Sequence, residues 1–155
     1  VGEHEQAAQL HRRAVELEPR NAAYLNNLAF SDFVRGRLEE AIAGFEEALR
    51  IEPMHARIRN NLGFACARAG RLERAAEHFS RAGTPAQARH NLAYAHELAG
   101  DLARAFDLYA QAVRLAPERE LSRRGLEQVA SRLGRQVPPD LGEAKVGYSN
   151  GEKER

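Results

Sequence analysis

Residues 28–53 read LAFSDFVRGRLEEAIAGFEEALRIEP, and the pattern of this stretch recurs along the chain. Apolar residues of helical period lie on both sides of Gly36, and Pro53 follows the second run. Glycine readily adopts the left-handed conformation that ends many helices, and proline cannot continue a helix. The stretch therefore predicts a hairpin of two helices joined at Gly36.

The hairpin repeats at a nearly constant spacing. Gly36, Gly70, Gly100 and Gly134 are 34, 30 and 34 residues apart. Alanines recur in the same frame and predict close contact between helices. They are Ala7, Ala41, Ala75 and Ala105 in one column, and Ala14, Ala48, Ala82 and Ala112 in another. We expect helices at residues 2–17, 22–35, 38–51, 56–69, 72–82, 85–99, 102–115 and 118–133.

The spacing of 30 marks a four-residue deletion, which falls where Gly83-Thr84-Pro85 replaces a last helical turn. Thr84 stands three residues before Gln87, with proline at the first helical position, as in a capping box. We therefore expect a shortened helix before Gly83 and a new helix that starts one turn early.

Composition excludes several classes of protein. The chain has 155 residues, a net charge of +1, 43% hydrophobic residues and one cysteine. This balance argues against disorder, membrane insertion, an internal disulfide and nucleic-acid binding. The six histidines lack the spacing of a metal site, and no catalytic or phosphate-binding motif is present. The sequence therefore indicates no enzyme, no cofactor and no metal.

With these repeats the chain resembles the tetratricopeptide repeat family, whose pattern places Leu-Gly, then Ala-x3-Phe, then Pro in 34 residues. The matching motifs include Leu62-Gly63, Ala75-x3-Phe79 and Pro53. The resemblance implies an all-α, right-handed superhelical solenoid of helical hairpins over residues 1–134. Its expected parts are a half-repeat at 1–19, repeats at 20–53, 54–84 (shortened) and 85–117, and a terminal helix at 118–134. Residues 135–155 are expected to form a flexible tail, with docking of the tail onto the array as the alternative.

A looser similarity is to bacterial repeat proteins that assist pilus and secretion-system assembly. It rests on the Asn-Leu-Ala/Gly-aromatic helices and the shortened repeat. It leaves both a cytoplasmic and a periplasmic location open, because the sequence contains no recognisable targeting signal.

One stripe of residues on the first helix of each hairpin carries the functional hypothesis. Positions four before, three after and seven after Asn27, Asn61 and Asn91 share a helical face. In the family that the chain resembles, this face lines a concave groove that binds peptides. The candidate groove residues are Asn27, Asn61, Asn91, Phe30, Phe64, Tyr94, Arg57, Arg68, Gln87, His90 and Leu98.

Each group in the stripe has an alternative explanation. The asparagines could grip a peptide backbone, or they could hydrogen-bond to a neighbouring helix. The aromatic residues could contact a ligand, or pack against the next helix. Arg57 and Arg68, with Arg123 or Arg124, would favour an acidic segment or a free C-terminus, or would simply face solvent.

The function that these residues favour is a protein–protein interaction scaffold that binds a peptide or protein segment in its groove. The alternative is self-assembly, or docking within a larger repeat chain, through exposed end helices. The N-terminal helix presents Ala7, Leu10, Ala14, Val15 and Leu17 without a preceding helix to cover them. We expect them to be covered by a second copy, giving a homo-oligomer, or by a further helix upstream.

Overall fold

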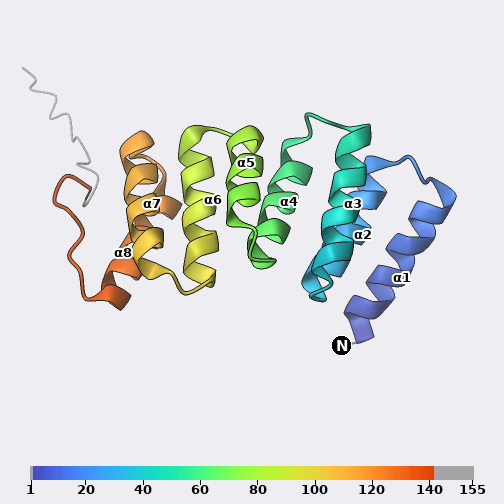
Figure 1. Cartoon of the computed structure of the whole chain (residues 1–155), viewed down its shortest axis with the longest axis horizontal. Helices are drawn as coiled ribbons and strands as arrows, with labels where there is room; N and C mark the ends of the chain where they lie inside the picture. The colour runs from blue at the N-terminus through green and yellow to red at the C-terminus, as the bar shows by residue number, and fades with distance from the viewer. Residues whose placement is uncertain (1, 142–155) are drawn as a thin grey trace, which may run out of the picture.

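A computed structural model describes residues 2–141, and this part of the chain folds into eight α-helices. Consecutive helices are antiparallel neighbours, and the hairpins succeed one another along the long axis of the molecule (Figure 1). The helices are α1 (Gly2–Leu17), α2 (Ala22–Val34), α3 (Leu38–Ile51), α4 (Ala56–Arg68), α5 (Leu72–Ala82), α6 (Pro85–Leu98), α7 (Leu102–Leu115) and α8 (Glu120–Leu133). The predicted all-α solenoid of hairpins is confirmed.

The four periodic glycines end helices, as predicted: three of them follow the first helix of a hairpin, and Gly134 follows the terminal helix α8. Gly36, Gly70, Gly100 and Gly134 have φ angles of 79°, 77°, 83° and 63°, all in the left-handed region. Side chains with a Cβ rarely adopt this conformation, so glycine is the residue that fits. The spacing of the glycines therefore sets the length of each hairpin.

The helix bounds agree with the expected ones to within two residues. The largest difference is at α8, which was expected to begin at residue 118 and begins at Glu120. A turn precedes it, closed by a 3.1 Å hydrogen bond from the Arg119 amide to the Ala116 carbonyl. Arg123 of the first helical turn donates to the Pro117 carbonyl, which holds this turn against the helix.

Small residues let the helices approach, and the second helix of each of the three hairpins α2–α3, α4–α5 and α6–α7 buries one aromatic ring. Phe45, Phe79 and Tyr109 are at most 2% exposed. A Cβ atom added to Gly63 would lie 2.5 Å from the Phe79 ring, and one added to Gly125 would lie 2.6 Å from the Tyr109 ring. These glycines are therefore required by packing rather than by backbone conformation.

The buried residues form two apolar clusters that meet at α6. The first contains residues of α2 to α6, including Phe45 and Phe79. The second contains residues of α6 to α8, including Tyr109 and Leu126. Ala88 and Ala95 of α6 belong to the first cluster, and Ala93 of the same helix belongs to the second.

The deletion shortens α5 as predicted. The helix has 11 residues, whereas α3 and α7 have 14 each. The capping box at the start of α6 is present: Thr84 Oγ1 accepts from the Gln87 amide at 3.3 Å, and the Thr84 amide donates to Gln87 Oε1 at 2.9 Å. The chain thus re-enters a helix directly after the shortened one.

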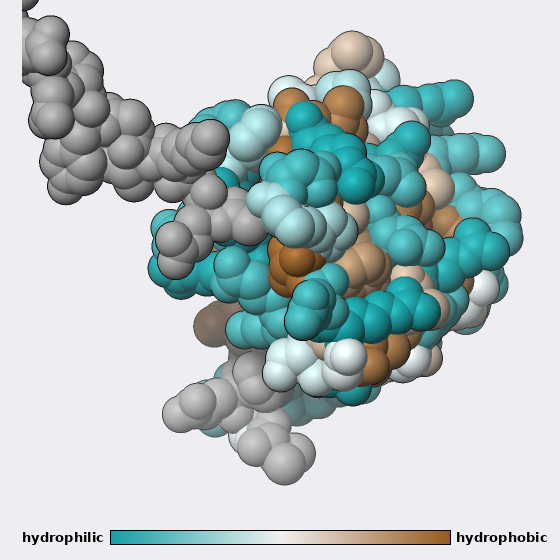
Figure 2. All heavy atoms as spheres, turned by 90° about the vertical axis from the view of Figure 1, so that its left-hand side faces the viewer, coloured by the Kyte–Doolittle hydropathy of each residue, from teal (hydrophilic) through white to brown (hydrophobic). Residues whose placement is uncertain are grey.

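The segment 135–141, the first part of the expected tail, packs on the last hairpin. Leu141 is 4% exposed and joins the second apolar cluster, with Val137 beside it. The guanidinium of Arg135 lies over the Phe106 ring, and Arg114 forms an ion pair with Asp140. Figure 2 views this end of the molecule, where polar side chains surround small apolar areas. Residues 142–155 of the expected tail lie outside the described residues.

Among the described residues, no helix combines the length and the apolar character needed to cross a membrane.

Candidate functional site

The predicted stripe lines two adjacent hollows on the first helices of the hairpins. The C-terminal halves of α2, α4 and α6 form an apolar groove of about 640 Å³, which we call the aromatic groove. The N-terminal halves of α4 and α6, with the end of α5 and Arg119 just before α8, form a smaller hollow of about 280 Å³, which we call the polar pocket. One helical face thus changes from polar to apolar along its length.

Six of the candidate residues line the aromatic groove. Phe30, Tyr94 and Leu98 are 48%, 44% and 68% exposed, which is high for large apolar side chains that lie so close together. The Phe64 ring lies at the centre of the groove, 4.8 Å from the Phe79 ring below it and 6.1 Å from the Tyr94 ring beside it. The full lining is Phe30, Phe33, Asn61, Phe64, Ala67, Arg68, Tyr94, Ala95, Leu98 and Ala99.

Arg68 ties two helices together at the edge of this groove. Its Nη1 donates to the Phe33 carbonyl at 2.8 Å, and its guanidinium lies 5.2 Å from the centre of the Phe33 ring. These contacts use one donor of the guanidinium and one face of the aromatic ring. Arg68 therefore shapes the groove as well as adding positive charge to it.

The asparagines are paired between helices, which is the alternative use considered for them. Asn61 Nδ2 donates to Asn26 Oδ1 at 3.0 Å, and Asn91 Nδ2 donates to Asn60 Oδ1 at 2.8 Å. Each pair links the first helices of neighbouring hairpins. The side-chain oxygens of Asn61 and Asn91 accept no hydrogen bond from the described residues and stay available to a ligand.

The polar pocket contains the other three candidates that face a hollow. These are Arg57, Gln87 and Asn91, which lie on the same helical face as the groove residues Phe64 and Tyr94. Because α5 ends early, the pocket is also bordered by the end of that helix. The full lining is Ala56, Arg57, Asn60, Phe79, Ala82, Gly83, Gln87, Asn91 and Arg119.

Two candidates, Asn27 and His90, line neither hollow. Asn27 accepts a 3.3 Å hydrogen bond from Asn26. His90 lies between helices: its Nδ1 is 3.1 Å from Ser122 Oγ, and its ring is 5.5 Å from the Tyr109 ring. A residue one position from the stripe is rotated by about 100° around the helix, which turns His90 toward α7 and α8.

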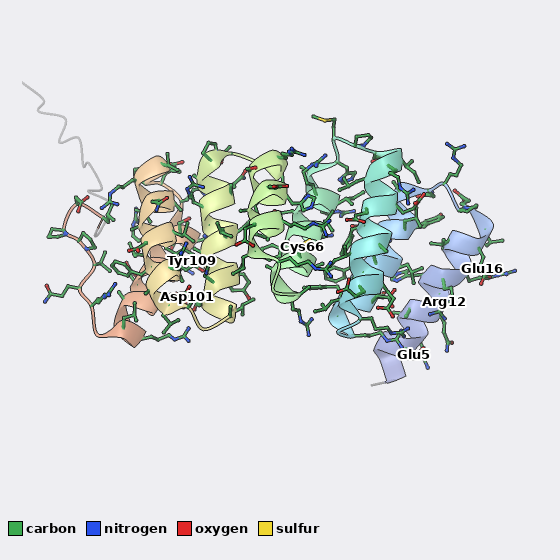
Figure 3. All side chains as sticks on the ribbon, in the orientation of Figure 1. Glu5, Arg12, Glu16, Cys66, Asp101 and Tyr109 are labelled. Carbon is green, nitrogen blue, oxygen red and sulfur yellow. The ribbon has the colours of Figure 1, made fainter. Side chains whose placement is uncertain are left out.

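The basic residues expected from the last helix face elsewhere. Arg123 donates to the Pro117 carbonyl, and Arg124 pairs with Glu120. Arg119, just before α8, instead reaches the polar pocket. Cys66, which lies on α4 (Figure 3), is fully buried, and burial raises the pKa of its thiol.

We predict that protonation of two partly buried histidines, His78 and His90, destabilises the fold. Burial lowers the pKa of His90, with a further contribution from Arg119, and burial also lowers the pKa of His78. The unfolded chain therefore binds protons at a higher pH than the folded chain does, and stability falls as the pH drops below about 7. Urea unfolding between about pH 7.5 and 5.5 should show this loss, and His90→Gln should reduce its slope. If the free energy of unfolding depended on pH equally in the variant and the wild type, His90 would not contribute to this dependence.

Sequence reasoning missed residues of both hollows for different reasons. Phe33 lies three residues after Phe30, so helical spacing could have included it in the stripe. Asn60 directly precedes Asn61, and the repeated Asn-Asn pair was a usable signal. Arg119 had no local signal, because only the stacking of α8 beside α6 brings it to the pocket.

Comparison with known families supports the repeat interpretation. Tetratricopeptide repeat profiles match residues 20–82 and residues 86–119. Comparison with curated protein sequences gives no match.

Several solved structures share the fold at low sequence identity. A crystal structure of MamA matches with a TM-score of 0.63 and 18% identity, over 86% of this chain and 80% of that one. PilF of Pseudomonas aeruginosa matches with a TM-score of 0.65 and 21% identity, over 86% of this chain and 63% of that one. PilW, described as a type IV pilus biogenesis factor, matches with a TM-score of 0.65 and 22% identity, over 85% and 63%. The chain belongs to the tetratricopeptide repeat family, and its repeats form a protein–protein interaction scaffold.

Proposed function

We propose that the aromatic groove binds the apolar side chains of a partner protein segment. The observation that carries this proposal is the cluster of Phe30, Tyr94 and Leu98, which remain exposed around one groove. Removing apolar surface from water contributes about 25 cal/mol for each Å². A partner segment that covers these side chains would therefore bind with this favourable free energy.

The shape and chemistry of the groove suit a peptide better than a small polar ligand. Its volume of about 640 Å³ lies within the range of about 300–1,000 Å³ typical of ligand sites. Its walls are mainly aromatic and aliphatic, and Asn61 and Arg68 supply polar groups at separate points. Asn61 Oδ1 can accept a backbone N–H of the bound segment, so apolar contacts and one backbone contact would act together.

The test is selection of peptides from a random library on the full chain, followed by titration of the selected peptides. Phe30→Ala, Tyr94→Ala and Leu98→Ala remove exposed groups, so the variants should stay folded. The triple variant should bind at least about tenfold more weakly, because it loses much of the apolar contact.

Met54→Ala with Leu115→Ala is the matched control, since both side chains are exposed and lie outside the groove. Circular dichroism would establish that both variants are folded. Selected peptides that bind the groove variant and the control variant equally well would overturn the proposal.

A second candidate function is self-assembly, supported by the outer face of α1. Leu10 and Leu17 are 71% and 68% exposed there, while Ala8 and Val15 face the array. Figure 3 shows Arg12 and Glu16 of the same helix at the outer end of the molecule. Light scattering over a range of concentrations distinguishes self-assembly from peptide binding. A dimer that Leu10→Glu abolishes would support assembly through α1. A monomer at all concentrations would contradict it.

A further inference from the structure

The walls of the aromatic groove consist largely of aromatic rings, which come from α2, α4 and α6. Phe30, Phe33, Phe64 and Tyr94 all line it. The Phe64 ring makes an angle of 61° with the Phe79 ring and of 80° with the Tyr94 ring, so these rings already meet edge to face. An aromatic ring is negative on its face and positive along its edge. The groove therefore offers ring edges and faces that another aromatic ring can match and an aliphatic side chain cannot.

Arg68 adds a fixed positive charge to the same groove. It donates to the Phe33 carbonyl at 2.8 Å, and its guanidinium lies 5.2 Å from the centre of the Phe33 ring. Arg68 is exposed and lines the groove, so the face of the guanidinium away from Phe33 is accessible to a ligand. Within residues 2–141 it forms no ion pair, and no acidic side chain is among the lining residues of the groove. The positive charge is therefore held in place and is not neutralised.

We propose that the aromatic groove selects its partner segment by an aromatic side chain, whose ring stacks on Arg68 and meets the rings of Phe64 and Tyr94. The negative face of such a ring complements the guanidinium, which stacks well on aromatic planes. Arg68 follows Phe64 by four residues on α4, so the two side chains are neighbours on one helical face. The Tyr94 ring, from α6, is 6.1 Å from the Phe64 ring. One ligand ring can thus contact all three side chains, and Arg68 is the residue that determines specificity.

The inference rests on the proposed function of the aromatic groove and names the side chain that the groove recognises. The full isotope-labelled chain is titrated with three uncharged probes, the N-acetyl amides of phenylalanine, cyclohexylalanine and leucine. A cyclohexyl ring is about as large as a phenyl ring and at least as apolar, but it has no π system. A preference for phenylalanine therefore reports aromatic character and not buried apolar area. No probe has a carboxylate, so Arg68 cannot act by binding one.

We expect the phenylalanine probe to bind at least about threefold more tightly than the other two. It alone should move the Nε–H signal of Arg68 upfield, because the ring current acts on protons above the ring plane. Arg68→Gln and Tyr94→Leu should each weaken its binding about twofold to fivefold and leave the cyclohexylalanine probe nearly unaffected. Both replace exposed side chains, and circular dichroism would establish that the variants are folded. Arg104→Gln, the control, removes the same charge from an exposed position on α7 and should leave all binding unchanged.

Equal dissociation constants for the phenylalanine and cyclohexylalanine probes would overturn the proposal, and so would a failure of the phenylalanine probe to bind. A preference that persists in both groove variants would also contradict it.

The two proposals fail separately. Peptides selected on the full chain that depend on Phe30, Tyr94 and Leu98, but keep their affinity when cyclohexylalanine replaces their aromatic residues, would leave the groove function intact and disprove aromatic selection. Peptides that bind without these three side chains would instead disprove the groove function.

Discussion

Phe79→Ala should lower the free energy of unfolding by about 3–5 kcal/mol, the range for removing a fully buried aromatic ring. Phe79 is 1% exposed and fills the interface between α4 and α5. Its ring contacts the Gly63 backbone and the Phe64 ring, whose centre is 4.8 Å away. Two helix backbones cannot collapse fully into the space left by the ring, so a cavity would add to the lost burial.

Urea unfolding followed by circular dichroism measures this change. Phe30→Ala is the matched control, because it removes the same ring from a half-exposed position of the groove. It should cost about 1 kcal/mol or less. Similar losses in the two variants would mean that Phe79 does not fill the α4–α5 interface.

Gly125→Ala should destabilise the protein by up to about 2 kcal/mol, although alanine normally stabilises a helix. In an open helix this change gains about 1 kcal/mol. Here the new Cβ would lie 2.6 Å from the Tyr109 ring. Tyr109 is 2% exposed, and its hydroxyl donates to Glu97 at 3.0 Å, so the ring has little freedom to move. An overpacking cost of about 1–3 kcal/mol therefore exceeds the helix-propensity gain.

A double-mutant cycle isolates the cause. In a Tyr109→Leu background the smaller side chain makes room for the added methyl group, so Gly125→Ala should become neutral or stabilising. Thermal or urea unfolding of the wild type, the two single variants and the double variant gives the coupling free energy between positions 109 and 125. Equal effects of Gly125→Ala in both backgrounds would show that contact with Tyr109 is not the reason for the loss.

The repeat structure could be predicted from the sequence because its signals are local. Glycine at the left-handed positions 36, 70, 100 and 134 and the capping box at Thr84 act within one or two turns of chain. The apolar period and the alanine columns then specify which face of each helix is buried. The start of α8 was placed two residues early, because the turn at residues 117–119 depends on contacts made by Arg119 and Arg123.

The candidate site was predicted only in part. The stripe on the first helices named nine residues that face a hollow, because helical spacing fixes which side chains share a face. The sequence did not show that the stripe is divided between two hollows, the aromatic groove and the polar pocket. His90 was assigned to it by proximity in sequence, whereas its ring packs against Tyr109.

The sequence by itself determined the helices, their hairpins and the shortened third repeat, since each depends on residues close together in the chain. Only the tertiary structure decided which groups meet across repeats. It paired Asn61 with Asn26 and Asn91 with Asn60, and it brought Arg119 beside Arg57. The segment that ends at Leu141 was likewise placed against the last hairpin by tertiary packing. The physical reason is that caps and periodicity act over a few residues, whereas hollows and amide pairs depend on how whole helices stack.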